Sequence, residues 1–192
     1  GGDIIFIEAT AMPGGKGFWC AAAGIMVGEL WAGDDNGQVW HRSAAGTWTS
    51  ELALPAGIGV YGIAQAEGAI FAVGDAGNVA YRPNSSTGTP WSRSQFTGTV
   101  LPTDWFNGVW AFDRNNAVTV GTNGIFARFT NGAWGNAATK LDTNNTEAFG
   151  VWGQTPSRVW VVGRNGLIVR VDDQKIYKLY AQMGIDFQSI YG

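Results

Sequence analysis

The sequence predicts an all-β fold, a β-propeller of four-stranded antiparallel blades, on three observations. Four segments of the 192-residue chain repeat one pattern, at 31–42, 71–82, 118–128 and 159–170. Their turn glycines at 37, 77, 124 and 166 are 40, 47 and 42 residues apart, a spacing typical of propeller or solenoid repeats. Short β-branched and aromatic runs alternate with turn residues, and helical periodicity is absent. Since one blade cannot bury both of its faces, successive blades must stack, and radial stacking makes a propeller.

The clearest copy of the repeat is predicted at 149–182. FGVWG at 149–153 is the first strand, and QTPS at 154–157 supplies turn residues. RVWVV at 158–162 is the second strand, followed by an Asn-Gly turn at 165–166 that suits a two-residue hairpin. The third strand is expected at 167–171 and the fourth at 176–180, which completes a four-stranded meander.

The remaining copies place three further blades at 18–54, 58–100 and 106–140, within one domain spanning 1–192. Residues 187–192 match the first strand of a blade, and 3–9 form a lone strand before the first full copy. We therefore expect both ends to form an incomplete fifth blade, which would close the ring and protect its edges. The alternative, a fragment of a larger propeller, stays open.

The composition argues against some classes of function. Charged residues make up 14% of the chain and the formal net charge is −3, so there is no basic field of the kind that nucleic-acid binding requires. No stretch approaches the ~18 consecutive apolar residues of a membrane span. The lone Cys20 cannot form a disulfide within the chain and is expected to be a buried, inert thiol.

Two segments carry a resemblance to a known family. FGVWG at 149–153 and RVWVVGRNGLIVR at 158–170 resemble the repeats of bacterial BNR-like propellers, a group that includes photosystem II assembly-factor-like proteins and cell-envelope lipoproteins. The resemblance covers most of the chain and implies the fold much more strongly than a function. It suggests a location outside the cytoplasm or in the cell envelope of a bacterium. The sialidase Asp box has only a partial match at 43–48, without the aspartate, so glycosidase activity is not carried over.

One arginine recurs at the same place in all four copies, and a propeller would arrange the four as a ring: Arg42, Arg82, Arg128 and Arg170. One interpretation is that each pairs with an acid or a carbonyl of its own or the neighbouring blade. The other is that the ring forms a basic strip that binds an acidic protein partner.

Aromatic residues recur in two places. Those of the innermost strands are expected to pack between blades, although an aromatic-lined pocket for a sugar or another flat ligand is the alternative: Trp19, Tyr61, Trp110, Trp152 and Tyr191. Three outer tryptophans follow loops and are expected at blade edges, where an exposed ring could stack on a sugar: Trp48, Trp91 and Trp134.

The residues available for catalysis are few. His41 is the only histidine and is expected to be structural, so a metal site built from histidines is excluded. The aspartates fall in turns and loops rather than on the innermost strands, where a propeller glycosidase would need converging carboxylates. We therefore expect no catalytic residues, no metal and no cofactor.

The sequence thus predicts a non-enzymatic binding or scaffold propeller whose loop face binds a protein partner, in an envelope or assembly complex. A lectin-like carbohydrate-binding module is the alternative, and a glycosidase-type enzyme is a distant third. The outer loops differ between copies, whereas a lectin usually repeats its site in each blade. This divergence favours a single partner surface.

Overall fold

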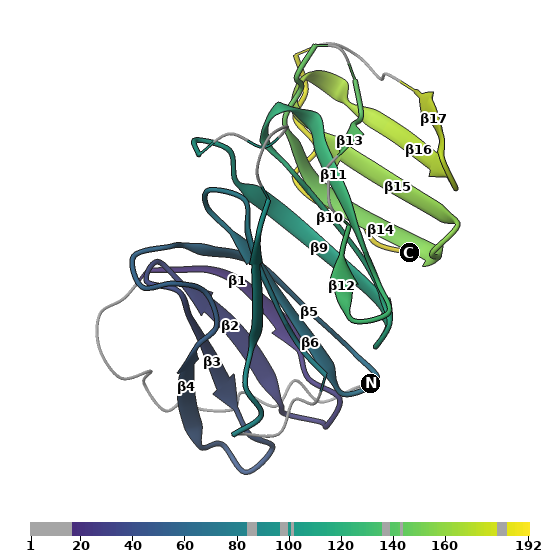
Figure 1. Ribbon diagram of the computed structural model, residues 1–192. Helices are drawn as coiled ribbons and strands as arrows, with labels where there is room; N and C mark the ends of the chain where they lie inside the picture. Colours follow the sequence, from purple (N-terminus) through teal and green to yellow (C-terminus); the bar gives the residue numbers. More distant parts are fainter. Residues whose placement is uncertain are drawn as a thin grey trace.

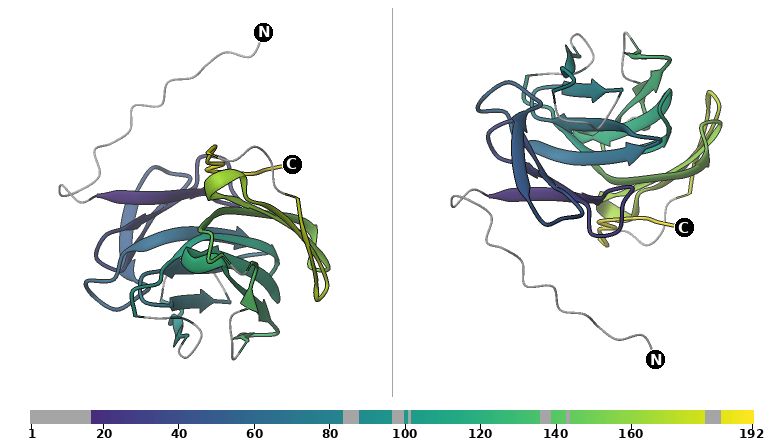
Figure 2. Two further views of the ribbon diagram at one scale, coloured as in Figure 1. Left: turned by 90° about the horizontal axis from the view of Figure 1, so that it is seen from above. Right: turned by 90° about the horizontal axis from the view of Figure 1, so that it is seen from below.

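The computed structural model of the chain describes residues 17–83, 88–96, 100, 102–135, 139–142, 144–179 and 184–192. These ranges contain four antiparallel sheets and two short 3₁₀ turns, which confirms the predicted all-β fold of four-stranded blades. The sheets fan out around a common centre, and their long axes turn progressively from one sheet to the next (Figures 1 and 2).

Each sheet is a meander whose strands pair in chain order. The first contains β1 (Phe18–Ala23), β2 (Leu30–Asp34), β3 (Gln38–Arg42) and β4 (Trp48–Leu52). The second contains β5 (Val60–Ala66), β6 (Ala69–Gly74), β7 (Asn78–Arg82) and β8 (Ser92–Gln95). The third contains β9 (Phe106–Asp113), β10 (Asn116–Gly121) and β11 (Ile125–Thr130), with β12 (Ala133–Trp134) and β13 (Thr139–Lys140) both paired to β11. The fourth contains β14 (Ala148–Thr155), β15 (Arg158–Gly163), β16 (Ile168–Asp172) and β17 (Lys175–Lys178).

The core lies between neighbouring sheets rather than inside any one of them. One apolar cluster joins the first and second sheets, another the second and third, and a third cluster joins the third and fourth. Phe71 of β6, for example, is fully buried and packs edge-to-face on Phe129 of β11, with ring centroids 5.0 Å apart. Stacking of sheets therefore supplies the apolar burial that a single blade lacks.

The innermost strands β1, β5, β9 and β14 contact one another in succession around the centre. At one end of the sheets, which we call the turn rim, lie the turns at 35–37, 75–77, 122–124 and 164–166 and the links between sheets. Two of the Asn-Gly turns on this rim, at 123–124 and 165–166, have positive φ at both residues: Asn165, for example, has φ of 53° and Gly166 has φ of 75°.

The predicted fifth blade stays a prediction. Its N-terminal part, 3–9, lies outside the described residues, and no strand is assigned at 184–192. Residues 187–192 nevertheless run beside β14, where an ideal Cβ on Gly150 would lie 3.0 Å from the Cα of Ser189. Gly108 of β9 faces Phe149 of β14 in the same way, so this segment occupies the next innermost position.

Candidate functional site

The candidate site lies on the turn rim, and glycines of the third and fourth repeats help to position it. Gly163 ends β15, where an ideal Cβ would lie 2.1 Å from the backbone oxygen of Glu147. Gly121 ends β10 in the same relation to Trp105, at 2.0 Å. Only a glycine permits this approach, since no side-chain movement can relieve a clash with backbone. Trp105 and Glu147, which precede the innermost strands β9 and β14, are thereby held at the rim.

Three aromatic rings stand in a row at this centre. Trp19 lies near the start of β1, Tyr61 near the start of β5, and Trp105 just before β9. The centroids of Trp19 and Tyr61 are 5.5 Å apart, and those of Tyr61 and Trp105 are 5.8 Å apart. Both tryptophan rings are steeply inclined to the tyrosine ring, at 76° and 72°. Trp19 is 61% exposed and Trp105 41%, so their rings remain available to a ligand.

These rings line a pocket of about 460 Å³, which we call the aromatic pocket: Trp19, Tyr61, Trp105, Asn107, Glu147, Phe149 and Gln188. Its polar groups converge on one carboxylate. The Glu147 Oε1 atom accepts hydrogen bonds from the Asn107 amide at 3.2 Å and the Trp105 indole at 3.5 Å. The other oxygen, Oε2, lies 2.9 Å from a guanidinium nitrogen of Arg164.

Tyr61 is held in its protonated form in the middle of this row. Its hydroxyl donates to the Oδ2 atom of Asp75 at 3.2 Å. Burial, together with the negative charges of Asp75 and Asp35, raises the pKa of Tyr61 to about 12. The hydroxyl is therefore a hydrogen-bond donor across the physiological range.

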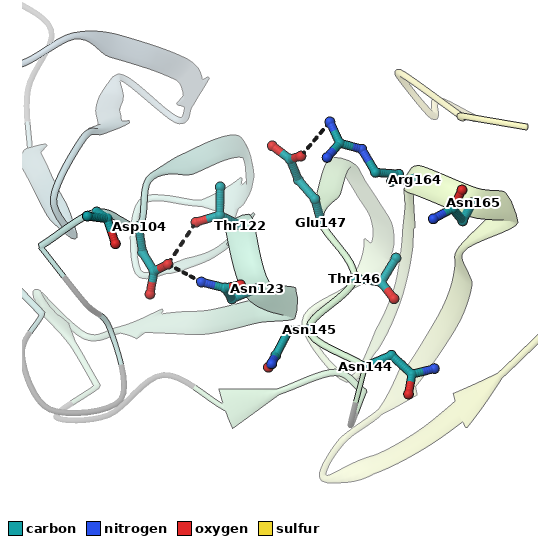
Figure 3. Close-up of a pocket in the computed structure, with 10 residues that line it drawn as sticks. Asp104, Thr122, Asn123, Asn144, Asn145, Thr146, Glu147, Arg164 and Asn165 are labelled. Carbon is teal, nitrogen blue, oxygen red and sulfur yellow. Dashed lines mark hydrogen bonds and ion pairs between the residues drawn. The ribbon is translucent and has the colours of Figure 1, made fainter. Parts of the chain in front are cut away.

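A second recess adjoins the first and shares Glu147 with it. This polar groove has a volume of about 770 Å³ and is lined by Thr103, Asp104, Thr122, Asn123, Asn144, Asn145, Thr146, Glu147, Arg164 and Asn165. Figure 3 shows Asp104, Thr122 and Asn123 on one side, and Asn144, Thr146 and Asn165 on the other. The two sides belong to successive blades.

Internal hydrogen bonds order one wall of the groove. The Oδ1 atom of Asp104 accepts from the Thr122 hydroxyl at 3.2 Å and from the Asn123 amide. Lys140 donates to the backbone oxygen of Asn123 at 2.8 Å. Side-chain amides and hydroxyls dominate the lining, and both groups can donate and accept.

The four repeated arginines lie on the third strands, away from both recesses. Arg82 is 1% exposed, forms an ion pair with Glu51 of the first sheet, and stacks over the Trp91 ring at 4.8 Å. Arg128 donates to the backbone oxygens of Pro156 and Asp173 in the fourth sheet, at 2.6 and 3.1 Å.

The other two arginines bond within their own blades. Arg42 donates to the backbone oxygen of Gly28 at 2.8 Å. Arg170 lies 3.1 Å from an oxygen of Asp172 and 4.6 Å from the Tyr177 ring centroid. Each arginine of the ring therefore has partners inside the chain, and a partner-binding role for the ring stays a prediction.

The outer tryptophans lie beside these arginines or in the core. Trp134 is 9% exposed and belongs to the cluster around Phe71, while Trp48 and Trp91 are half-buried. The indole N–H of each is buried, with no hydrogen-bond partner among the residues that the structure describes. Their proposed role in stacking on a ligand stays a prediction.

The innermost aromatic residues do not share one height. Trp110 and Trp152 lie in the middle of their strands, where their centroids are 6.4 Å apart, whereas Trp19 and Tyr61 lie at the rim. Position along the strand explains the difference. Trp19 and Tyr61 are the second residues of β1 and β5, and the second residues of β9 and β14 are Asn107 and Phe149. Tyr191 is 90% exposed.

The single histidine belongs to a local packing group. His41 Nε2 lies 2.7 Å from Glu29 Oε1, and its ring stacks on Trp31 with centroids 3.9 Å apart.

Burial raises the pKa of the Cys20 thiol to about 12. Across the described ranges, no group of three or more histidine, cysteine or acidic residues could hold a metal ion. No described helix is long and apolar enough to span a membrane.

Sequence reasoning missed most residues that line the two recesses, among them Trp105, Asn107, Glu147 and Arg164. Trp105 and Glu147 precede their innermost strands, at a position where the earlier blades have Gly17 and Gly59. Because no side chain recurs there, the repeat carried no signal for it. The one available clue was the position itself, directly before a central strand.

No protein-family model and no curated protein matches the chain. Solved structures do. A streptogramin B lyase structure has a TM-score of 0.71 over 88% of this chain and 55% of that chain, at 15% identity. YCF48 bound to a D1 peptide has a TM-score of 0.54 over 81% of this chain and 50% of that chain, at 16% identity. The Cps50 (Swd1) β-propeller domain of Myceliophteria thermophila has a TM-score of 0.63 over 85% and 56%, at 8% identity.

These likenesses show a β-propeller fold. The chain spans about half the length of the structures it matches. That the chain belongs to the family of BNR-like propellers stays a prediction.

Proposed function

We propose that the chain is a non-enzymatic binding propeller whose turn rim binds an extended segment of a protein partner. The observation that carries the proposal is the continuity of two recesses of different character. The aromatic pocket and the polar groove meet at Glu147, so one segment can place a side chain in the first and lie along the second.

The chemistry of each recess suits a peptide. Trp and Tyr rings supply much of the binding energy at protein interfaces, because they bury a large area with little loss of conformational freedom. Side-chain amides can both donate to and accept from a peptide backbone, and the groove presents four of them: Asn123, Asn144, Asn145 and Asn165. Among the similar structures, YCF48 is bound to a peptide, which supports this class of ligand.

The test is selection of peptides from a random displayed library on the wild-type chain. A variant carrying Trp19→Ala and Trp105→Ala serves as the counter-target, and Tyr191→Ala serves as the control for loss of an exposed ring. We expect enriched peptides to bind wild type and Tyr191→Ala equally and the double variant at least about ten-fold more weakly. Equal binding to the double variant would refute the proposed surface.

Carbohydrate binding is the second candidate, and one observation favours it. The exposed indoles of Trp19 and Trp105 stand beside amide and carboxylate groups, a combination that can stack on and hydrogen-bond to a sugar ring. Saturable binding of one sugar class on a glycan array, lost in the double tryptophan variant, would favour this function over peptide binding. A location in the bacterial cell envelope remains part of the proposal.

A further inference from the structure

The aromatic pocket lies among carboxylates. Asp75 accepts the hydroxyl hydrogen of Tyr61 at 3.2 Å, and Asp35 is close enough for its charge to act on the same hydroxyl. Glu147 lines the pocket itself, in contact with Trp105 and Asn107. Two carboxylates, those of Asp75 and Glu147, are therefore hydrogen-bonded to the row of three rings.

Only part of this charge is balanced. Arg164 pairs with Glu147 through Oε2, and its guanidinium carbon lies 5.6 Å from the centroid of Phe149. In the described part of the chain, no ion pair joins Asp35 or Asp75 to a cation. The Asp75 carboxylate, which is hydrogen-bonded to Tyr61, is consequently not balanced by an ion pair, within a chain whose formal net charge is −3.

The arrangement of the rings adds to this attraction. Trp19 and Trp105 flank Tyr61 at 76° and 72°, so they form walls on two sides of it. A cation within about 6 Å of an aromatic face is attracted by the ring quadrupole, and most strongly by that of tryptophan. An aromatic pocket alone would accept any apolar side chain, but aromatic rings beside a carboxylate without an ion pair discriminate in favour of a cation.

We propose that the aromatic pocket takes the cationic side chain of an arginine or lysine in the protein partner, with the rings of Trp19, Tyr61 and Trp105 around it and Glu147 and Asp75 opposite its charge. This inference rests on the proposed binding function and names the chemistry of its partner. It assigns the partner segment a basic residue, whereas the ring of four arginines had suggested an acidic partner. The difference arises because those arginines bond to carbonyls and carboxylates of the chain itself.

Three matched peptides test the role of charge. Blocked pentapeptides with a central arginine, citrulline or glutamate between glycines are titrated into the wild-type chain to about 10 mM and followed by calorimetry. Citrulline keeps the shape of arginine and removes its charge. We expect saturable binding of the arginine peptide, at least about ten-fold weaker binding of the citrulline peptide, and weakening by added salt.

Variants locate the effect. Trp105→Ala should abolish binding of the arginine peptide, Asp75→Asn should weaken it several-fold, and Tyr191→Ala should leave it unchanged. Thermal unfolding of each variant checks that the fold is kept. Equal affinity for arginine and citrulline, preference for glutamate, or no saturation with the arginine peptide would each overturn the inference.

The two proposals fail differently. If library-selected peptides bind the turn rim but tolerate replacement of every basic residue, the cation inference is wrong and the binding function stands. If no selected peptide depends on Trp19 and Trp105, the binding function itself is wrong.

Discussion

Replacing Gly163 with alanine should destabilise the fold through one contact. The new Cβ would lie 2.1 Å from the backbone oxygen of Glu147, about 1.3 Å closer than an ordinary 3.4 Å contact. The φ of Gly163 is −175°, an extended value that any residue adopts, so the cost is steric rather than conformational. To make room, the end of β15 must move away from the start of β14.

The size of the effect follows from what this movement breaks. The Arg164 N–H donates to the Glu147 oxygen at 2.9 Å, and the Phe187 N–H donates to the Gly163 oxygen at 3.0 Å. Losing such bonds costs about 1 kcal/mol each, and overpacking adds about 1–3 kcal/mol. We expect the free energy of unfolding to fall by about 3–5 kcal/mol, which for a chain of this size lowers the melting temperature by about 6–20 °C.

Thermal unfolding followed by circular dichroism measures this loss, and Gly135→Ala is the matched control. An ideal Cβ on Gly135 has its nearest atom, the backbone oxygen of Arg128, at 3.6 Å, so the control should change stability by less than about 0.5 kcal/mol. If both variants melt within about 2 °C of wild type, the close approach that positions Glu147 does not exist. Because Gly163→Ala displaces Glu147, it should also weaken binding of the arginine peptide to the aromatic pocket.

Four further substitutions test the ion pairs and the packing. Arg82→Ala should lower the free energy of unfolding by about 3–5 kcal/mol, because the guanidinium is buried in an ion pair. Arg42→Ala, at a more open site, should lower it by less than about 1 kcal/mol. Equal unfolding midpoints of the two variants in urea would contradict this expectation. Burial alone would raise the pKa of Glu29, but hydrogen bonds from backbone N–H groups and from His41 outweigh it and lower the pKa. The folded-state pKa of Glu29 is therefore below the unfolded value of 4.5, so the ionised side chain stabilises the fold above that pH and this stabilisation is lost on acidification. The Glu29→Gln variant should melt at a lower temperature than wild type at pH 7, and the difference should shrink below pH 4.5. A difference that stays constant with pH would refute the assignment. Phe71→Ala removes a fully buried ring and should cost about 3–5 kcal/mol by urea unfolding, whereas a cost below about 1 kcal/mol would show that the second and third sheets do not pack as described.

The fold was predictable because its determinants are local and repeated. Asn-Gly turns such as 165–166 and glycines such as Gly163 specify backbone geometry by themselves, and four copies reinforce one interpretation. The fourth strand of the last blade was also predictable, since a strand was expected at 176–180 and β17 is observed at Lys175–Lys178.

The candidate site was not predictable from the repeat, because it depends on positions that differ between blades. Trp105 and Glu147 occupy the place of Gly17 and Gly59, so an alignment of copies treats them as variation. The arginines show the opposite problem. Their recurrence was visible in the sequence, but the Glu51 side chain that pairs with Arg82 comes from another blade, and only the packing of sheets brings them together.

The central claim is that ligands bind at the centre of the turn rim, and tryptophan indole resonances test it most directly. A ¹⁵N-labelled chain is titrated with the strongest library-selected peptide, and the indole N–H signals are assigned by single substitutions. We predict that the signals of Trp19 and Trp105 shift and saturate with one dissociation constant, while those of Trp48, Trp91 and Trp134 stay in place. Saturating shifts confined to the three outer tryptophans would place the binding surface at the blade edges and contradict the account.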